Sequence, residues 1–200
     1  MQTLALGSAV RTAALSLCGA LALAACGDDT TRAGKRGDRL ATLPIAAGSV
    51  TTSGISAGGY MAVQFHVAHS SVVGGVGVVA AGPYYCAENS LRHALGRCMK
   101  GDEPIAVDEL AGLTSEFALA GRIDPIANLA NDRVWIFHGG ADPVVARPVV
   151  DALQAYYELF VDPHGVQRNE LAGAGHTFPT AAQNLQDCAR TDPPFVGSCG

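Results

Sequence analysis

The feature that most constrains this chain is a serine between an expected strand and an expected helix. Residues 54–58, Gly-Ile-Ser-Ala-Gly, fit the pattern G-x-S-x-G. Residues 49–53 are short and β-branched, as in a strand, whereas residues 57–70 contain no proline and supply apolar side chains for a helix. A serine on such a sharp turn projects its hydroxyl from the end of the sheet. The pattern therefore predicts that Ser56 is a nucleophile.

The small residues around Ser56 have expected roles of their own. Gly54 and Gly58 would let the backbone turn tightly without clashes of Cβ atoms. The backbone amide of Ala57 would point to the place where an oxyanion forms. A chain with 24 glycines can match so short a pattern by chance, but the strand–turn–helix context favours the functional interpretation.

A candidate acid follows a second expected strand. Residues 133–138 are an apolar run of strand character, and residues 139–143, Gly-Gly-Ala-Asp-Pro, come directly after it. Asp142 is therefore expected on a glycine-rich loop at the carboxyl end of a strand, where it could orient a catalytic base. Three other carboxylates are expected to cap helices or form turns: Asp124, Asp132 and Asp162.

A candidate base follows a third expected strand. His176 lies in a loop of small residues directly after residues 166–171. The order Ser56, Asp142, His176 is similar to that of the α/β-hydrolases. The other histidines are expected to have structural roles. His66 and His69 would pack within the helix or lie on its solvated face, and His138 would shape the loop that carries the acid. His93 and His164 are expected at the surface. No pattern of metal ligands occurs, so neither a metal nor another cofactor is expected.

The expected elements predict an α/β fold with a parallel sheet and flanking helices. Few residues that are expected to be ordered precede the strand before Ser56, although an ordinary α/β-hydrolase places several strands before its nucleophile. The expected strands are residues 49–53, 75–80, 133–138 and 166–171, with crossover helices around residues 109–120 and 148–160.

The first 26 residues are expected to be a targeting signal. Arg11 supplies positive charge, and residues 13–25 are apolar but too short for an ordinary membrane span. Leu-Ala-Ala-Cys at residues 23–26 resembles a bacterial lipobox, which would place a lipid on Cys26; the alternative is an ordinary secretory signal cut nearby. Both predict export, either as a lipoprotein on the periplasmic or outer face of a bacterial membrane or as an extracellular protein.

The remainder of the chain divides into a tether and one domain. Residues 27–43 are hydrophilic and are expected to form a flexible tether before a domain spanning residues 44–200. The formal net charge is −5 and the basic residues are scattered, so no nucleic acid partner is expected. A membrane is expected as a partner only through the lipid on Cys26.

The cysteines agree with export. Cys18 lies in the signal segment, and four cysteines fall within the expected domain, which suggests two disulfides. Four cysteines allow three connectivities. We favour the two short-range pairs, Cys86–Cys98 and Cys188–Cys199.

Several motifs together resemble the extracellular-type poly(3-hydroxybutyrate) depolymerases. The resemblance extends over about residues 44–200, and the sequence Gly-Pro-Tyr-Tyr-Cys at residues 82–86 is more discriminating than the serine pattern. The matching stretches are residues 54–64, 81–86, 134–139, 142–145, 175–180 and 194–200.

The resemblance implies a secreted serine esterase that cuts short-chain polyhydroxyalkanoates and their oligomers without a cofactor. It implies Ser56 as nucleophile, His176 as base, Asp142 as acid and the Ala57 amide as an oxyanion donor. The loop of residues 82–99 would wall the cleft, and its tyrosines, Tyr84 and Tyr85, would offer apolar surface to the substrate. Packing beside a disulfide is the alternative for both tyrosines.

One departure from the family affects these expectations. Some members have a circularly permuted α/β-hydrolase fold, with further strands and a second oxyanion donor near a His-Gly-Cys sequence after the catalytic histidine. Neither H-G-C nor H-G-G-G occurs in this chain. We therefore expect an α/β-hydrolase domain that is incomplete at its C-terminus. Whether a second polypeptide completes the sheet does not follow from the sequence. Two alternative functions remain: an esterase acting on feruloyl or acetyl esters, and a truncated, non-catalytic lipoprotein.

Overall fold

The computed structural model describes residues 45, 46 and 48–200. The expected signal, Cys26 and the expected tether lie outside the described residues. The elements are β1 Val50–Ile55, α1 Ala57–Ala68, β2 Val73–Val79, α2 Leu91–Leu95, α3 Val107–Leu119, η1 Ile126–Asn131, β3 Arg133–Gly139, α4 Arg147–Glu158, η2 Pro163–Gly165, β4 Val166–Leu171, β5 Phe178–Thr180, β6 Gln186–Asp187 and β7 Val196–Ser198.

The principal sheet has four strands in the order β1-β2-β3-β4, all parallel to their neighbours. The predicted α/β fold class is confirmed, and each of the four predicted strands is present. The two predicted crossover helices correspond to α3 and α4. No helix in the described part of the chain is both long and apolar enough to span a membrane.

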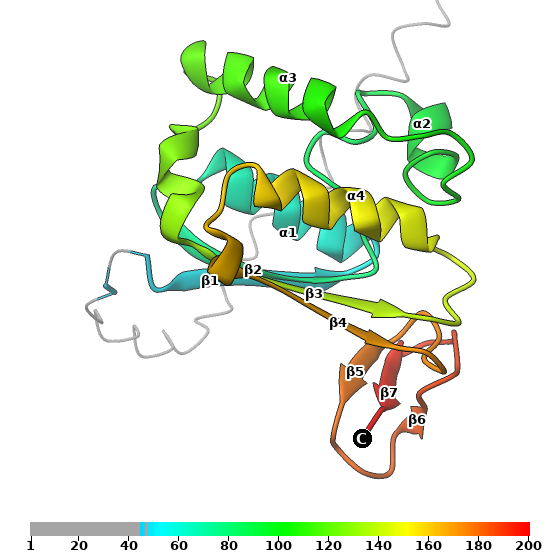
Figure 1. Ribbon diagram of the computed structural model, residues 1–200. Helices are drawn as coiled ribbons and strands as arrows, with labels where there is room; N and C mark the ends of the chain where they lie inside the picture. Colours follow the sequence, from blue (N-terminus) through cyan, green and yellow to red (C-terminus); the bar gives the residue numbers. More distant parts are fainter. Residues whose placement is uncertain (1–44, 47) are drawn as a thin grey trace, which may run out of the picture. The chain divides into compact units, whose positions relative to one another are not determined.

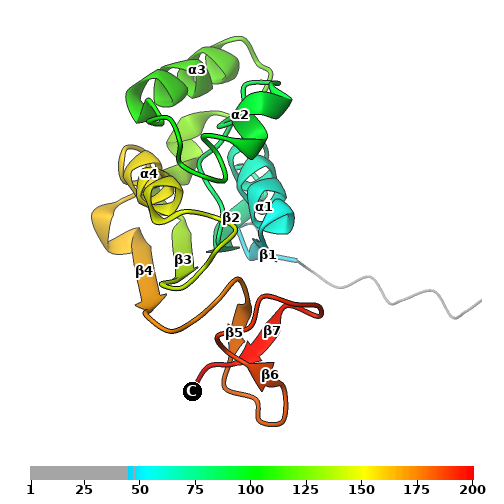
Figure 2. The same ribbon diagram turned by 90° about the vertical axis from the view of Figure 1, so that its right-hand side faces the viewer.

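The described helices lie on one face of this sheet (Figures 1 and 2). Strand order follows chain order, and parallel crossovers are right-handed, so each crossover helix falls on the same side. Helix α1 packs on β1 and β2, α4 packs on β3 and β4, and α3 packs on α4 as an outer layer. The core therefore lies between the sheet and the pair α1 and α4.

The core is built from side chains that face each other across this interface. Alternation along β3 directs Val134 and Ile136 towards the helices. The proline at the second residue of α4 suits the first turn of a helix, where its missing N–H is not needed. The largest fully buried side chains are Val63, His66, Val67, Val73, Val78, Val79, Leu129, Val134, Ile136, Leu153, Tyr156 and Tyr157.

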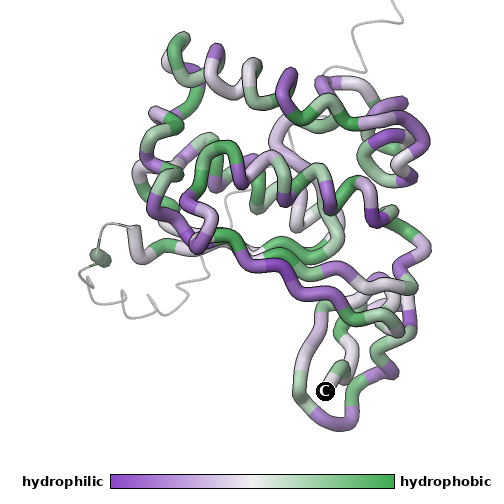
Figure 3. Tube along the Cα trace, in the orientation of Figure 1, coloured by the Kyte–Doolittle hydropathy of each residue, from purple (hydrophilic) through white to green (hydrophobic). Residues whose placement is uncertain are grey.

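The two edges of the sheet differ in charge. Edge strand β4 is hydrophilic (Figure 3), and its Arg168 pairs with Asp151 at 2.6 Å and with Glu170 at 3.2 Å. Charged edges of this kind resist pairing with other strands. Edge strand β1 carries no charge, and within the described residues no strand pairs with its outer edge.

The C-terminal residues form a small second sheet that no pattern in the sequence predicts. Its strands, in the order β5-β7-β6, contain only two or three residues each and are parallel. The structure joins Cys188 to Cys199 with an S–S distance of 2.02 Å and Cys86 to Cys98 with 2.13 Å. These are the two short-range pairs favoured from the sequence.

Candidate active site

Ser56 occupies a strained turn between β1 and α1. Its φ of 56° and ψ of −124° lie in a region that side-chain-bearing residues rarely adopt. The Ser56 N–H donates to the Val79 carbonyl at 2.9 Å, and the Ser56 carbonyl accepts from the Tyr60 N–H at 2.9 Å. The turn is therefore fixed on one side by β2 and on the other by the first turn of α1.

Two glycines allow this turn, and only one of them, Gly54, is among the two that were expected. A Cβ atom on Gly54 would lie 2.3 Å from the carbonyl carbon and oxygen of Gly58, and one on Gly59 would lie 3.0 Å from the Gly54 carbonyl oxygen. A Cβ on Gly58 would meet nothing within 4 Å. The steric role predicted for Gly58 is wrong, because the close approach involves its backbone and leaves space on its Cα.

Asp142 lies on the loop after β3, with a side chain that is 0 % exposed. Its Oδ1 accepts from the N–H groups of Val144 at 2.7 Å and Val145 at 3.0 Å. Its Oδ2 accepts from His176 Nδ1–H at 2.8 Å. Burial acts to raise the pKa of this carboxyl, but these hydrogen bonds outweigh burial and hold the pKa below the ordinary 3.8.

His176 follows β4 and is held by the C-terminal segment. Its N–H donates to Thr191 Oγ1 at 2.9 Å, and the preceding Gly175 N–H donates to the Cys188 carbonyl at 2.9 Å. The Phe195 ring lies edge-on to the imidazole, with the ring centroids 6.2 Å apart. These supporting residues were not found from the sequence, in which the Cys188–Cys199 pair was the only signal that this segment folds back.

The three candidate residues lie at the same end of the sheet, where the strands have their carboxyl ends. Ser56, Asp142 and His176 follow β1, β3 and β4 respectively, and the carboxyl ends of parallel strands share one edge. The structure joins Asp142 to His176, whereas no hydrogen bond between Ser56 and His176 is present among the described residues. Ala57 is the first residue of α1, so its amide has no acceptor within the helix.

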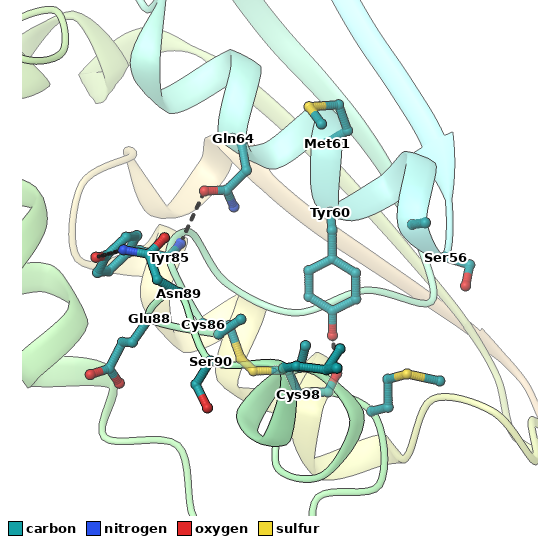
Figure 4. A pocket seen from close by; sticks show the side chains of 15 residues that line it. Ser56, Tyr60, Met61, Gln64, Tyr85, Cys86, Glu88, Asn89, Ser90 and Cys98 are labelled. Atoms are coloured by element: carbon teal, nitrogen blue, oxygen red, sulfur yellow. Dashed lines mark hydrogen bonds between the residues drawn. A yellow bond between two sulfur atoms is a disulfide. The ribbon is translucent and has the colours of Figure 1, made fainter. Parts of the chain in front are cut away.

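A groove opens beside Ser56, with a volume of about 750 Å³ (Figure 4). Tyr60 crosses its floor and donates a hydrogen bond from its hydroxyl to the Cys98 carbonyl. We call this cavity the Ser56 groove. Its lining residues are Ser56, Ala57, Tyr60, Met61, Gln64, Tyr85, Cys86, Ala87, Glu88, Asn89, Ser90, Leu91, Ala94, Cys98 and Met99.

The two tyrosines expected in the cleft have different positions. Tyr85 lines the Ser56 groove. Tyr84 is only 7 % exposed, belongs to the core and packs edge-on against Phe117. The Tyr85 ring also lies edge-on to Phe117, with the ring centroids 5.0 Å apart. The expectation that Tyr84 offers its surface to substrate is nevertheless wrong, because Tyr84 is buried and only Tyr85 lines the groove.

Two further histidines are buried. His138 donates from Nε2 to the Val145 carbonyl at 3.1 Å and so supports the loop that carries Asp142. His66 lies inside α1 and contacts both Asp132 and Tyr157 at 3.0 Å. Within the described residues, no three side chains of His, Cys, Asp or Glu gather as metal ligands would.

Comparison with known proteins finds two similar curated sequences. Poly(3-hydroxybutyrate) depolymerase of Delftia acidovorans is 40 % identical over 89 % of this chain and 35 % of its own length. Polyhydroxybutyrate depolymerase of Talaromyces funiculosus is 34 % identical over 76 % of this chain and 44 % of its own length. The chain thus spans less than half the length of these relatives. No protein-family model matches it.

Two solved structures of PHB depolymerases are also similar to this chain. The crystal structure of a PHB depolymerase from Penicillium funiculosum has a TM-score of 0.69 and 31 % identity, over 78 % of this chain and 48 % of that one. A PHB depolymerase variant complexed with an R3HB trimer also has a TM-score of 0.69, with 30 % identity over the same shares. The fold is thus of the α/β-hydrolase type. These similarities support assigning the chain to the poly(3-hydroxybutyrate) depolymerase family.

Proposed function

We propose that this chain is a serine esterase with the triad Ser56, His176 and Asp142. The observation that carries the proposal is the buried Asp142–His176 hydrogen bond of 2.8 Å at the same sheet edge as a serine with φ 56° and ψ −124°. A strained serine and a carboxylate-oriented imidazole are the two components that nucleophilic ester cleavage requires.

The chemistry proceeds in two steps. His176 Nε2 takes the proton of Ser56 as its hydroxyl oxygen attacks the ester carbonyl, and the same proton then passes to the departing alcohol. Water, deprotonated by His176, attacks the acyl-enzyme, and His176 then passes this proton to the Ser56 oxygen as the acid is released. Asp142 holds the imidazole tautomer and stabilises the imidazolium. Catalytic hydrogen bonds often tighten only when substrate is bound, so this mechanism does not require a Ser56–His176 hydrogen bond in the free protein.

The Ala57 amide stabilises the oxyanion in this mechanism. It is the first N–H after the nucleophile and lies at a helix N-terminus, where the helix dipole also favours negative charge. Removal of one such donor typically lowers kcat by about 100- to 1,000-fold.

The substrate class follows from the relatives and from the groove. Two relatives are named for poly(3-hydroxybutyrate) or polyhydroxybutyrate, and one solved neighbour holds an R3HB trimer. The Ser56 groove, with side chains such as Met61 and Leu91, suits a neutral ester with apolar branches. Poly(3-hydroxybutyrate) and its oligomers are therefore the substrates that we assign to this chain, and Tyr85 is a contact for them.

Export is part of the proposal. The two disulfides fit an oxidising compartment, and the first 26 residues resemble a lipoprotein signal ending at Cys26. Mass spectrometry of the membrane fraction would show a diacylglyceryl-modified Cys26 if the lipobox is used. A mature chain without that modification would indicate an ordinary secretory signal.

Hydrolysis assays test the esterase proposal. Purified protein is expected to hydrolyse p-nitrophenyl butyrate and to release (R)-3-hydroxybutyrate from its trimer, with both activities lost in Ser56→Ala. A feruloyl ester assayed in parallel separates the substrate classes. Equal turnover by the wild-type protein and the Ser56→Ala variant, or no turnover by a folded protein, would contradict the proposal.

A further inference from the structure

The Ser56 groove extends well beyond the reacting serine. Met61 and Gln64 lie on successive turns of α1, and Leu91 and Ala94 from the α2 side line the same cavity. Gln64 is eight residues after Ser56, which places it about 12 Å further along the helix axis. A ligand that reaches both residues must therefore be longer than a single small ester.

The orientation of the Gln64 side chain is fixed by one backbone donor. Gln64 Oε1 accepts a hydrogen bond from the Tyr85 N–H at 3.2 Å, as Figure 4 shows. A backbone N–H can only donate, so the amide oxygen must face Tyr85 and the NH₂ group must point away from it. Gln64 makes no other hydrogen bond with the described residues, so its two N–H donors remain for a ligand.

The rest of the groove shows which ligand would use these donors. The apolar side chains of Met61, Leu91 and Met99 line it, and no lysine or arginine occurs among the described residues that form its walls. The lining carboxylate, Glu88, is paired with Arg97. The groove is thus suited to uncharged chains with repeated carbonyl acceptors and short apolar branches, and it has no cation to receive a free carboxylate end.

We propose that Gln64 Nε2 donates a hydrogen bond to the carbonyl of an ester unit remote from the one cleaved at Ser56, so that the groove selects neutral inner stretches of a linear oligoester. The inference rests on the proposed esterase function. It makes Gln64 a residue that determines specificity for chain length. Monomeric esters do not reach it, whereas oligomers gain a hydrogen bond that favours their binding.

The test is a binding titration that needs no turnover. In a Ser56→Ala background, the methyl ester of the (R)-3-hydroxybutyrate trimer is titrated against protein with and without Gln64→Glu. Glutamate keeps an oxygen for the Tyr85 N–H but replaces the donor with an acceptor, so the Kd is expected to rise about five- to tenfold. The Tyr85 amide resonance should be retained, which shows that the loop is intact. Methyl 3-hydroxybutyrate should bind equally to both proteins.

Several outcomes would overturn the inference: an equal Kd for both proteins, no saturable trimer binding, or a loss of affinity that is the same for monomer and trimer. Hydrolysis of p-nitrophenyl butyrate by the wild-type protein separates this inference from the esterase proposal. If that activity is present and the trimer Kd is unchanged, Gln64 is not the donor but the esterase stands. If Gln64→Glu weakens trimer binding but the esterase activity is absent, the binding role of Gln64 is supported and the proposed mechanism is wrong.

Discussion

Two buried pairs of histidine and aspartate lie in this molecule and differ in what they can do. His66 Nε2 lies 3.0 Å from Asp132 Oδ2, and His176 Nδ1 lies 2.8 Å from Asp142 Oδ2. Both imidazoles are almost completely buried, at 0 % and 4 % exposure. By distance and burial alone, either pair could be taken for the orienting half of a triad.

The remaining nitrogen of each ring separates the two pairs. His66 Nδ1 accepts from the Tyr157 hydroxyl at 3.0 Å, so both nitrogens of this ring are occupied. His176 Nε2 has no hydrogen-bond partner among the described residues. Asp132 precedes β3, whereas Asp142 follows it, so the pairs lie at opposite ends of the strand. A catalytic pair thus needs an imidazole nitrogen without a hydrogen-bond partner and must lie at the end of the sheet that carries the nucleophile.

Loss of His176 is expected to have the largest effect. His176→Ala removes the base, and removal of such a residue from a serine hydrolase typically lowers kcat by about 10⁶-fold. The measurement is kcat with p-nitrophenyl butyrate. A residual rate near that of the wild-type protein would place the base elsewhere, and activity lost equally in His66→Ala at full folding would remove the distinction between the pairs.

The carboxylates give a matched comparison. Asp142→Asn is expected to lower kcat by about 10⁴-fold, because the amide favours the wrong imidazole tautomer. Asp132→Asn is the control, and its rate per folded molecule should equal that of the wild-type protein. Equal losses in the two variants would show that the comparison is wrong.

His66 should instead determine stability. His66→Ala leaves the Asp132 carboxylate, with a side chain only 11 % exposed, without its partner and is expected to lower the free energy of unfolding by about 3–5 kcal/mol. Urea denaturation measures this value, with the rate per folded molecule as the control. A loss below about 1 kcal/mol would contradict the structural role.

The pH dependence of stability should also come from His66. Burial lowers the pKa of His66 below its ordinary 6.5, more than Asp132 raises it. The unfolded chain therefore binds this proton first, and stability falls as pH decreases below 6.5 until the lowered pKa is reached. The stabilisation from Asp142 is present above about pH 3.8, the ordinary pKa of this carboxyl, and is lost only as the pH falls below that value. Urea denaturation between pH 7 and pH 5 measures how the free energy of unfolding changes with pH. This pH dependence should be weaker in His66→Gln than in the wild-type protein, and an equal dependence would exclude His66 as its source.

Tyr157→Phe should have the smallest effect. The substitution removes the hydroxyl that donates to His66 Nδ1 and leaves that nitrogen buried without a donor, at a cost of about 1 kcal/mol. Urea denaturation measures the change, and Tyr156→Phe, which removes the hydroxyl that contacts Thr114 at 2.8 Å, is the control outside the histidine pair. No loss of stability would indicate that water replaces the hydroxyl.

The sequence predicted the elements that local patterns determine. β1, α1 and the position of Ser56 followed from a β-branched run, a serine pattern and a helix without proline. The parallel sheet with its crossover helices was also predicted, whereas the strand order came from the structure. Asp142 and His176 were found because each lies on a loop of small residues directly after a predicted strand.

Features that depend on distant contacts were not predicted. His66 and Asp132 are 66 residues apart, and nothing near either position marks them as partners. The small β5-β7-β6 sheet has strands too short for any periodicity, although it supports His176. Tyr85 lines the groove and Tyr84 does not. The backbone turns at Tyr85, whose φ is 56°, and two consecutive tyrosines in the sequence do not indicate such a turn.

The central claim is that His176, and not His66, activates Ser56. A fluorophosphonate probe, with the labelled residue located by mass spectrometry, tests it directly in the wild-type, His176→Ala and His66→Ala proteins, each compared under conditions in which it is folded. We predict that the probe labels Ser56 in the wild-type and His66→Ala proteins and that labelling is lost in His176→Ala. Absence of labelling in the folded wild-type protein, or labelling of Ser56 that does not depend on His176, would contradict the account.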